Sequence, residues 1–306
     1  MKRTSLLGSV LLAGSAMAWA HVMNHDPQAG PSWFALDPGT WVLLTLAALL
    51  YFQGRRLLRQ RTRAPDTPQA RRSLWLFCSG WLALAVALGP PLDPLGGYLF
   101  SAHMVQHELL MLVAAPLLVL SRPGGVLLWG LPAGGRRLFG AMRRQGGLRS
   151  AWGWLSSPHG AWLVNALVLW GWHLPALFDA SVLHEGVHAL QHASFFGSAL
   201  LFWWALLYGS GQRNPGGVIY LFTTAVHSSL LGALLTFSPT VWYAPYLDTT
   251  AVFGLSPLDD QRIGGLIMWI PAGLVFLAAG LALTARLLRD ENPMAAERDI
   301  GGERHD

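Results

Sequence analysis

The chain has a single cysteine and few charged residues for its length. Of its 306 residues, only 12% are charged, about half the usual share of soluble domains, whereas 53% are hydrophobic. Cys78 alone excludes an intramolecular disulfide and any Cys-x-x-Cys metal or redox motif. Histidine and methionine are therefore the side chains of this sequence that can bind soft or borderline metal ions. A soluble protein of this composition would expose large apolar patches, so the composition favours a membrane protein.

Long apolar runs follow one another along the chain. A membrane-spanning helix needs roughly 17–25 mostly apolar residues, and most of the runs have this length, although the first is short. We therefore predict an all-α membrane protein, a bundle of about seven transmembrane helices within residues 38–289. The predicted spans are residues 38–52, 73–89, 103–120, 161–178, 184–208, 217–237 and 263–288.

The two ends of the chain differ from this central domain. Lys2 and Arg3 precede an apolar stretch, and Ala18-Trp19-Ala20 matches a small-x-small cleavage site, so residues 1–20 are typical of a signal peptide. An uncleaved signal anchor is the alternative. Residues 21–37 are then an extracytoplasmic N-terminal segment, and the charged residues 290–306 form a cytoplasmic tail.

Basic residues are distributed very unequally among the predicted loops. The loops after the first, third and fifth spans, together with the C-terminal tail, contain 18 of the 21 lysines and arginines. The positive-inside rule therefore predicts that the N-terminus lies outside and the C-terminus inside. Arginines placed between apolar runs fit this topology better than a nucleic-acid-binding face, so we expect a lipid bilayer and no nucleic acid as partner.

The eleven histidines are concentrated where spans begin or end. His103 and His107 lie four residues apart at the start of the third span, and therefore on one helix face. His184, His188 and His192 repeat this spacing at the start of the fifth span. A His-x-x-x-His pair offers two ring nitrogens to one ion, and a second helix can complete the ligand shell.

Depth in the membrane groups these histidines further. With a rise of about 1.5 Å per residue, His107, His173 and His192 fall at a similar depth near the outer face, with His227 deeper. Imidazole within hydrocarbon is costly unless it is paired, hydrated or bound to a metal. Interhelical hydrogen bonding is the alternative role. We predict a metal site formed by His103, His107, His173, His184, His188, His192 and His227, with weaker contributions from Met104, Met111, His21 and His25.

The donor set restricts the metal and leaves several functions open. Imidazole and thioether ligands without thiolate favour copper, then zinc. A zinc-dependent intramembrane hydrolase with Asp93 or Asp179 as base is an alternative, although the chain has no His-Glu-x-x-His motif. A b-type haem held by His107 with His192, or by a second histidine pair, His173 with His227, is another.

Further motifs accompany the histidines. The third span continues from His103-Met104-x-Gln106-His107 into Ala115-Pro116 and ends at Arg122-Pro123, and the fourth contains Trp172-His173-x-Pro175. Gly254-Leu255-x-Pro257-Leu258-x-Asp260-Gln261 precedes the seventh span. In this combination, over about residues 41–289, the chain resembles the CtaG family of cytochrome c oxidase assembly factors.

The resemblance implies a multi-pass protein of the bacterial inner membrane that is not an enzyme. It implies a role in assembling a haem–copper oxidase, with copper passed from a periplasmic donor to an oxidase subunit. Leu117 stands where the family usually has a second proline. The resemblance carries over to His103, His107, His173, His188 and His192 as site residues.

Overall fold

The computed structural model describes residues 30–34, 36–62, 67–209 and 216–290, and all regular elements among them are helices. The predicted signal peptide, the candidate ligands His21 and His25, and almost all of the predicted tail lie outside the described residues.

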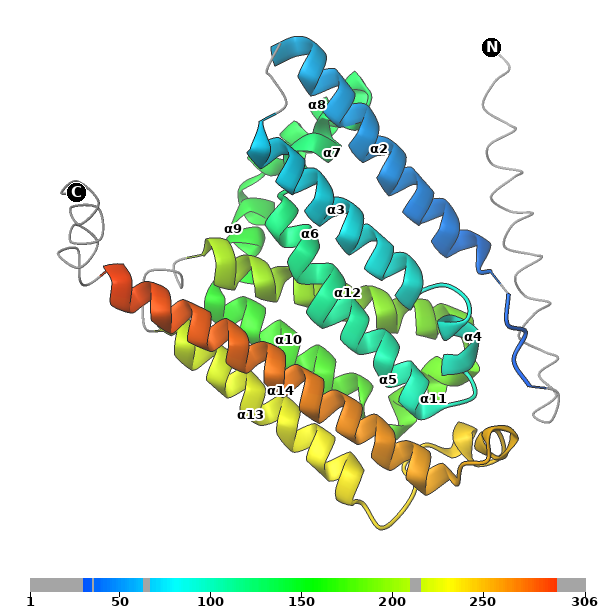
Figure 1. The fold of residues 1–306 in the computed structure, drawn as a ribbon. Coiled ribbons are helices and arrows are strands. Elements are labelled where there is room, and N and C mark those ends of the chain that lie inside the picture. The colour runs from blue at the N-terminus through cyan, green and yellow to red at the C-terminus, as the bar shows by residue number, and fades with distance from the viewer. Residues whose placement is uncertain (1–29, 35, 63–66, 210–215, 291–306) are drawn as a thin grey trace, which may run out of the picture.

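The helices pack side by side, and the longest run nearly in parallel or antiparallel directions (Figure 1). In chain order they are α2 (Pro38–Thr62), α3 (Pro68–Ala87), α4 (Leu92–Gly96), α5 (Phe100–Glu108), the π-helix η2 (Leu109–Ala114), α6 (Ala115–Ser121), α7 (Gly124–Gly130), α8 (Ala133–Arg144), α9 (Gly146–Leu155), α10 (Pro158–Trp172), α11 (Pro175–Leu183), α12 (Glu185–Tyr208), α13 (Gly216–Phe237), the short 3-10 helices η4 (Ala244–Tyr246) and η5 (Thr250–Phe253), and α14 (Pro257–Asp290).

Several of these segments are long and apolar enough to cross a membrane. Four qualify by themselves, namely Phe100–Ser121, α12, α13 and Pro257–Arg289, and a fifth is added if α10 and α11 form one bent span. The prediction of an all-helical protein with several spans is therefore confirmed. Because α2 and α3 are long enough but fall short in apolar content or carry too many charges, the number seven stays a prediction.

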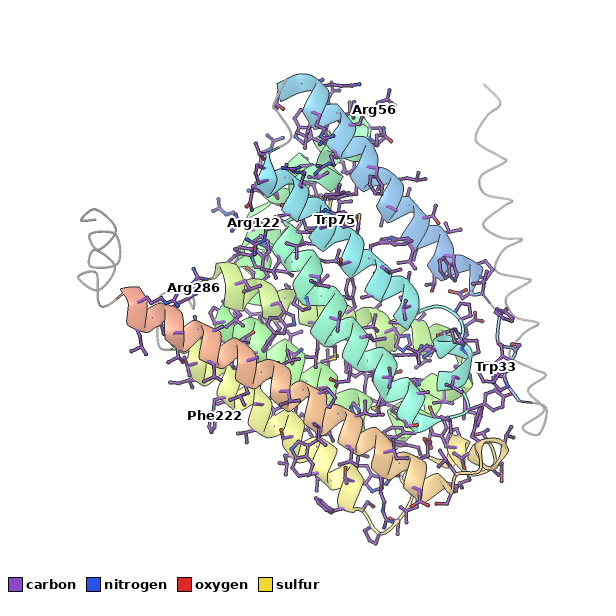
Figure 2. The ribbon with its side chains drawn as sticks, viewed as in Figure 1. Trp33, Arg56, Trp75, Arg122, Phe222 and Arg286 are labelled. Carbon is purple, nitrogen blue, oxygen red and sulfur yellow. The ribbon has the colours of Figure 1, made fainter. Side chains whose placement is uncertain are left out.

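Apolar side chains on the outer surface of the bundle agree with a lipid environment. Trp75 on α3 and Phe222 on α13 are 71% and 67% exposed, and Phe222 lies at the outer edge of the bundle (Figure 2). Many leucines of α2, α13 and α14 are similarly exposed. In water such a surface would form a large apolar patch, whereas in a bilayer it contacts acyl chains.

The fourth predicted span, residues 161–178, is not one continuous helix. α10 ends at Trp172 and α11 begins at Pro175, with a bend of 75° between them. Proline has no N–H, and it drives the residue before it out of the helical region. Leu174 accordingly has an extended backbone. The break leaves His173 at the C-cap of α10, where its ring is buried.

The third predicted span changes helix type in its middle because of a proline. In the π-helix η2, the carbonyl of Met111 would accept a hydrogen bond from the residue five positions later, which is Pro116 and has no N–H. The indole Nε1–H of Trp203 donates to this carbonyl instead, at 2.8 Å. An α12 side chain therefore compensates for the proline.

Two glycines allow the backbones of α2 and α7 to touch. A Cβ atom added at Gly54 would overlap the carbonyl oxygen of Val126, and one added at Gly130 would overlap that of Leu50. Both glycines are buried. The contact therefore depends on the absence of a side chain at both positions.

We expect Gly130→Ala to separate α2 from α7 and to destabilise the protein by about 1–3 kcal/mol, the usual cost of an overpacked contact. Thermal unfolding in detergent measures the loss as a lower midpoint. Gly125→Ala on the same helix is the matched control, because a Cβ there meets no atom within 4 Å. Equal midpoints for the two variants would show that the close contact is not needed.

Candidate metal centre

Histidines from two helices converge at one end of the bundle. Within α5, the ring centroids of His103 and His107 are 4.5 Å apart, and within α12 those of His188 and His192 are 4.2 Å apart. Between the helices, the ring of His103 lies 5.3 Å from that of His188 and 5.5 Å from that of His192. The two predicted His-x-x-x-His pairs therefore face each other.

Three of these residues have the arrangement of a metal site. His103, His188 and His192 each offer one ring nitrogen, and these three nitrogens all lie within 4.8 Å of one another. Around a tetrahedral ion with metal–nitrogen bonds near 2.0 Å, ligand nitrogens are separated by about 3.3 Å. Small ring movements are sufficient to close this difference, so the three residues fit a metal ion.

Two more histidines adjoin the three and have nitrogens without partners. The ring of His107 lies 5.3 Å from that of His192 and 6.3 Å from that of His173. Neither nitrogen of His107 has a hydrogen bond, and in His173 only Nδ1 has one, to the carbonyl of Leu169 at 2.7 Å. A buried polar group without a partner costs about 1–3 kcal/mol. Both residues are therefore candidates for an additional ligand of the metal ion.

The side chains of Gln191 and Tyr246 orient the ring of His103. The hydroxyl of Tyr246 donates to the carbonyl of Gly96 at 2.9 Å, and its oxygen lies 3.4 Å from Nδ1 of His103. The amide oxygen of Gln191 lies 3.0 Å from Nε2 of His103 and accepts a hydrogen bond from its N–H, which leaves the lone pair of the neutral ring on Nδ1. A hydrogen bond from the second ring nitrogen is the usual way in which proteins orient a metal-binding histidine.

The helix α5 that carries His103 is fixed from two sides. The carboxylate of Asp260, at the start of α14, accepts hydrogen bonds from the backbone N–H of Phe100 and from the backbone N–H and hydroxyl of Ser101. The amide of Gln106 donates to the carbonyl of Ala87 and to the carboxylate of Asp93. These contacts set the position of α5 relative to α14 and α3.

Aromatic rings and one acidic group surround the histidines. Phe178 lies 5.1 Å from the ring of His103, and Phe195 lies 4.3 Å from that of His107. Asp93 on α4 is the nearby acid. Burial raises the pKa of Asp93, while the charge of His188 and the hydrogen bond from Gln106 act in the opposite direction. The wall of the site is therefore mainly apolar.

Not all of the predicted ligands join the cluster. His184 is exposed and precedes α12 in an extended conformation, so the predicted stripe of three histidines has only two members on the helix. His227 lies against Trp162 at 5.4 Å, and its ring contacts no other histidine among the described residues. Met104 is fully buried among aromatic side chains, and Met111 packs beside the same core.

Other residues at the site were not assigned a role from the sequence. Gln191 lies one residue before a predicted ligand, on the same helix face as His188, and its polarity within an apolar span is a signal that could have identified it. Asp260 lies in the first turn of α14, where acidic residues are typical. This pattern does not indicate that its carboxylate caps α5 instead. Tyr246 reaches His103 from a loop more than 140 residues away in sequence, and no local pattern indicates that contact.

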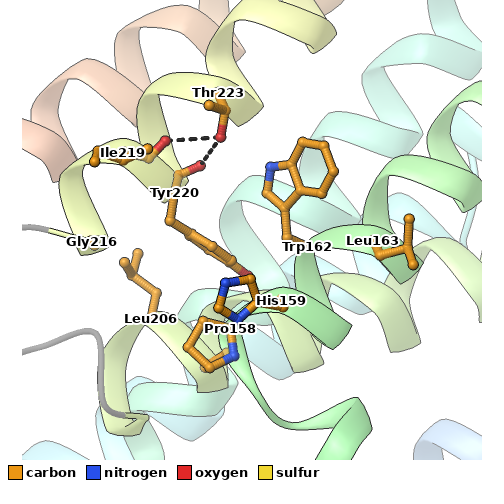
Figure 3. Close-up of a pocket in the computed structure, with 11 residues that line it drawn as sticks. Pro158, His159, Trp162, Leu163, Leu206, Gly216, Ile219, Tyr220 and Thr223 are labelled. Atoms are coloured by element: carbon orange, nitrogen blue, oxygen red, sulfur yellow. Dashed lines mark hydrogen bonds between the residues drawn. The ribbon is translucent and has the colours of Figure 1, made fainter.

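A separate apolar cavity of about 610 Å³ lies between α10, α12 and α13 (Figure 3). His159 at the start of α10 and Tyr220 on α13 line it. The fourteen residues from His159 to His173 correspond to about 21 Å along the helix. The cavity therefore lies at the other end of α10 and is not part of the histidine cluster.

Comparisons with known proteins place the chain in a family. A family model described as cytochrome c oxidase caa3 assembly factor matches residues 49–290. The uncharacterized protein Mb0105 of Mycobacterium bovis is 28% identical over 82% of the chain, and the uncharacterized protein ML1998 of Mycobacterium leprae is 26% identical over 79%. The chain spans only 39% and 38% of the length of these two relatives. No solved structure matches the chain. The family match covers most of the sequence, and the chain therefore belongs to the family of cytochrome c oxidase caa3 assembly factors.

Proposed function

We propose that this protein binds copper at His103, His188 and His192 and passes it to a subunit of a haem–copper oxidase during assembly. One observation carries the proposal: three histidine nitrogens from two helices lie within 4.8 Å of one another in a member of an oxidase assembly family. Copper is the cargo here, and the protein need not catalyse a reaction.

The donor set supports copper as that cargo. Imidazole binds both copper and zinc, and no thiolate is available near the site. Tight structural zinc sites have four ligands at ideal spacing. Three nitrogens leave the fourth position of such a site open, which suits an ion that has to leave again.

Burial decreases toward one ligand and suggests a path for the ion. His103 and His192 are buried, whereas His188, one turn closer to the start of α12, is only partly buried. An incoming ion would first meet His188 and then the deeper His192 and His103. The unpartnered nitrogens of His107 and His173 lie beyond them.

We also propose that seven helices cross the bacterial inner membrane, with the histidine cluster at the periplasmic end. Arg56, Arg122 and Arg286 lie at the end of the bundle opposite to Trp33 (Figure 2). Arginine is favoured on the cytoplasmic side, so the histidines face the compartment where a periplasmic donor and the copper subunit of the oxidase would be found.

Haem and zinc are the competing assignments. The rings of His107 and His192 are in edge contact at 5.3 Å, too close for a porphyrin between them, and His227 faces Trp162 rather than His173. Metal analysis of the purified protein separates copper from zinc, and a Soret band would identify haem.

We expect deletion of the gene to lower the activity and the copper content of the oxidase to background, with partial restoration by added copper. The wild-type gene should restore both, whereas a gene carrying His103→Ala should not, because it lacks the one ligand of the three that α5 supplies. His184→Ala, outside the cluster, is the control and should restore both. Normal oxidase copper in a clean deletion strain would contradict the proposal.

A further inference from the structure

A second, smaller cavity lies at the end of the bundle opposite to the histidines. It has a volume of about 200 Å³ and lies among the start of α3, the end of α6 and the end of α12. Fifteen residues separate Arg122 from His107, which corresponds to about 22 Å along the helices. The cavity is lined by Gln69, Arg72, Ser73, Leu76, Leu120, Arg122 and Tyr208.

Two positive charges line this cavity without a negative partner among the described residues. No carboxylate of the described residues forms an ion pair with Arg72 or Arg122, and none lines the cavity. Two guanidinium groups beside one space repel each other unless an anion lies between them. Their planar N–H groups match the oxygens of a phosphate group, to which arginine binds with two hydrogen bonds at once.

The backbone of Arg122 is held in an uncommon conformation. Its φ of +50° lies in the left-handed region, and no other residue except glycine among those described adopts a positive φ. Glycine is the usual residue at such a helix end, and a side chain there costs roughly 1–2 kcal/mol. The guanidinium lies over the ring of Tyr208, 4.1 Å from its centroid. Arg122 is thus fixed at the cavity although glycine would suit the backbone better.

The rest of the lining indicates what the anion is attached to. Leu76 and Leu120 complete the cavity, and Trp75 beside Leu76 is 71% exposed on the outer face of α3. Ser73 and Gln69 add a hydroxyl and an amide to the lining. The lining therefore combines groups that can bind phosphate with apolar side chains, next to an exposed apolar residue of α3.

We propose that Arg72 and Arg122 bind the phosphate group of an anionic phospholipid, with the acyl chains lying along α3. Basic pockets between membrane helices on the arginine-rich side commonly hold such headgroups. The volume of about 200 Å³, equal to roughly seven water molecules, accommodates a phosphate group. The site is distinct from the histidine cluster, and its occupant is a lipid rather than a metal ion.

Binding of lipids to the purified, delipidated full chain tests this proposal by native mass spectrometry. Phosphatidylglycerol is compared with phosphatidylcholine of the same acyl chains, and inorganic phosphate serves as the anion without a lipid. We expect phosphatidylglycerol to bind preferentially, and Arg72→Gln to weaken its binding roughly tenfold or more, as loss of a charged hydrogen bond predicts.

Two further variants make the test specific. Arg122→Gly removes the guanidinium but suits the left-handed backbone, so its unfolding midpoint should not fall while phosphatidylglycerol is lost. Arg56→Gln removes the same charge from an exposed position on α2, outside this cavity, and should retain the lipid. Equal lipid loss in Arg56→Gln, or unchanged binding in Arg72→Gln and Arg122→Gly, would overturn the proposal. Inorganic phosphate that binds as tightly as the lipid and displaces it would overturn the lipid assignment.

Discussion

Replacing His188 and His192 together by alanine should abolish copper binding by the purified protein. The pair supplies two of the three nitrogens that lie within 4.8 Å of one another, and the remaining His103 is engaged with Gln191. Loss of a residue that merely supports a metal ligand costs about 10–100-fold in affinity, so loss of two ligands should exceed about 100-fold. Elemental analysis and a competition titration with a copper chelator measure the effect.

His184→Ala is the matched control for this experiment. His184 precedes the same helix and is exposed, and it has no ring contact with the cluster. Its replacement should leave copper content and affinity unchanged. If the double variant and His184→Ala bind copper equally well, the convergence of the histidines serves helix packing instead. An unfolding midpoint like that of the wild type shows that the double variant is folded.

Asp260→Ala should give the largest loss of stability among substitutions at this end of the molecule. Its carboxylate accepts hydrogen bonds from two backbone N–H groups and one hydroxyl at the start of α5. Removing a helix cap costs about 0.5–2 kcal/mol, and hydrogen bonds to charged groups contribute about 1.5–3 kcal/mol each. We expect a loss of about 2–4 kcal/mol, seen as a lower unfolding midpoint in detergent. Weaker copper binding should accompany it, because α5 carries His103.

The neighbouring Asp259 provides the comparison. Its carboxylate is exposed, and it pairs with Arg262 at 3.6 Å on the same helix. Exposed ion pairs contribute less than about 1 kcal/mol, so Asp259→Ala should change the midpoint little. Asp260→Asn, which keeps the shape but loses the charge, should fall between the two. A similar midpoint for both alanine variants would show that the cap of α5 is dispensable.

The histidine cluster was predictable from local spacing and depth, but not completely. Four-residue spacing is a property of a single helix, and the pairs of α5 and α12 are found as predicted. The predicted common depth of His107, His173 and His192 agrees with the structure, where the ring of His107 lies close to those of His173 and His192. Depth does not determine the direction in which a side chain points, however, and His227 on α13 faces Trp162 instead.

Other features depended on contacts that the sequence does not reveal. Pro175 could have signalled the break after α10, but the apolar run continues through it and favours one span. Residues 124–155, a polar stretch in the sequence, form the helices α7, α8 and α9, of which α7 packs against α2 through glycines. The contact between Tyr246 and His103 joins a loop to a helix, and only the tertiary structure brings them together.

The π-helix in the third span has a consequence for both ends of the molecule. A π-turn takes up one residue more than an α-turn, and one residue corresponds to about 100° of rotation around an α-helix. The angular register that places His103 and His107 on one side therefore does not extend to Arg122. A helical wheel drawn over the whole segment would misplace one end. The helix α12 contacts both ends of this one span. The other neighbours differ, with α14 against α5 at the histidines and α3 against α6 near the arginine, because the turn resets the register between them.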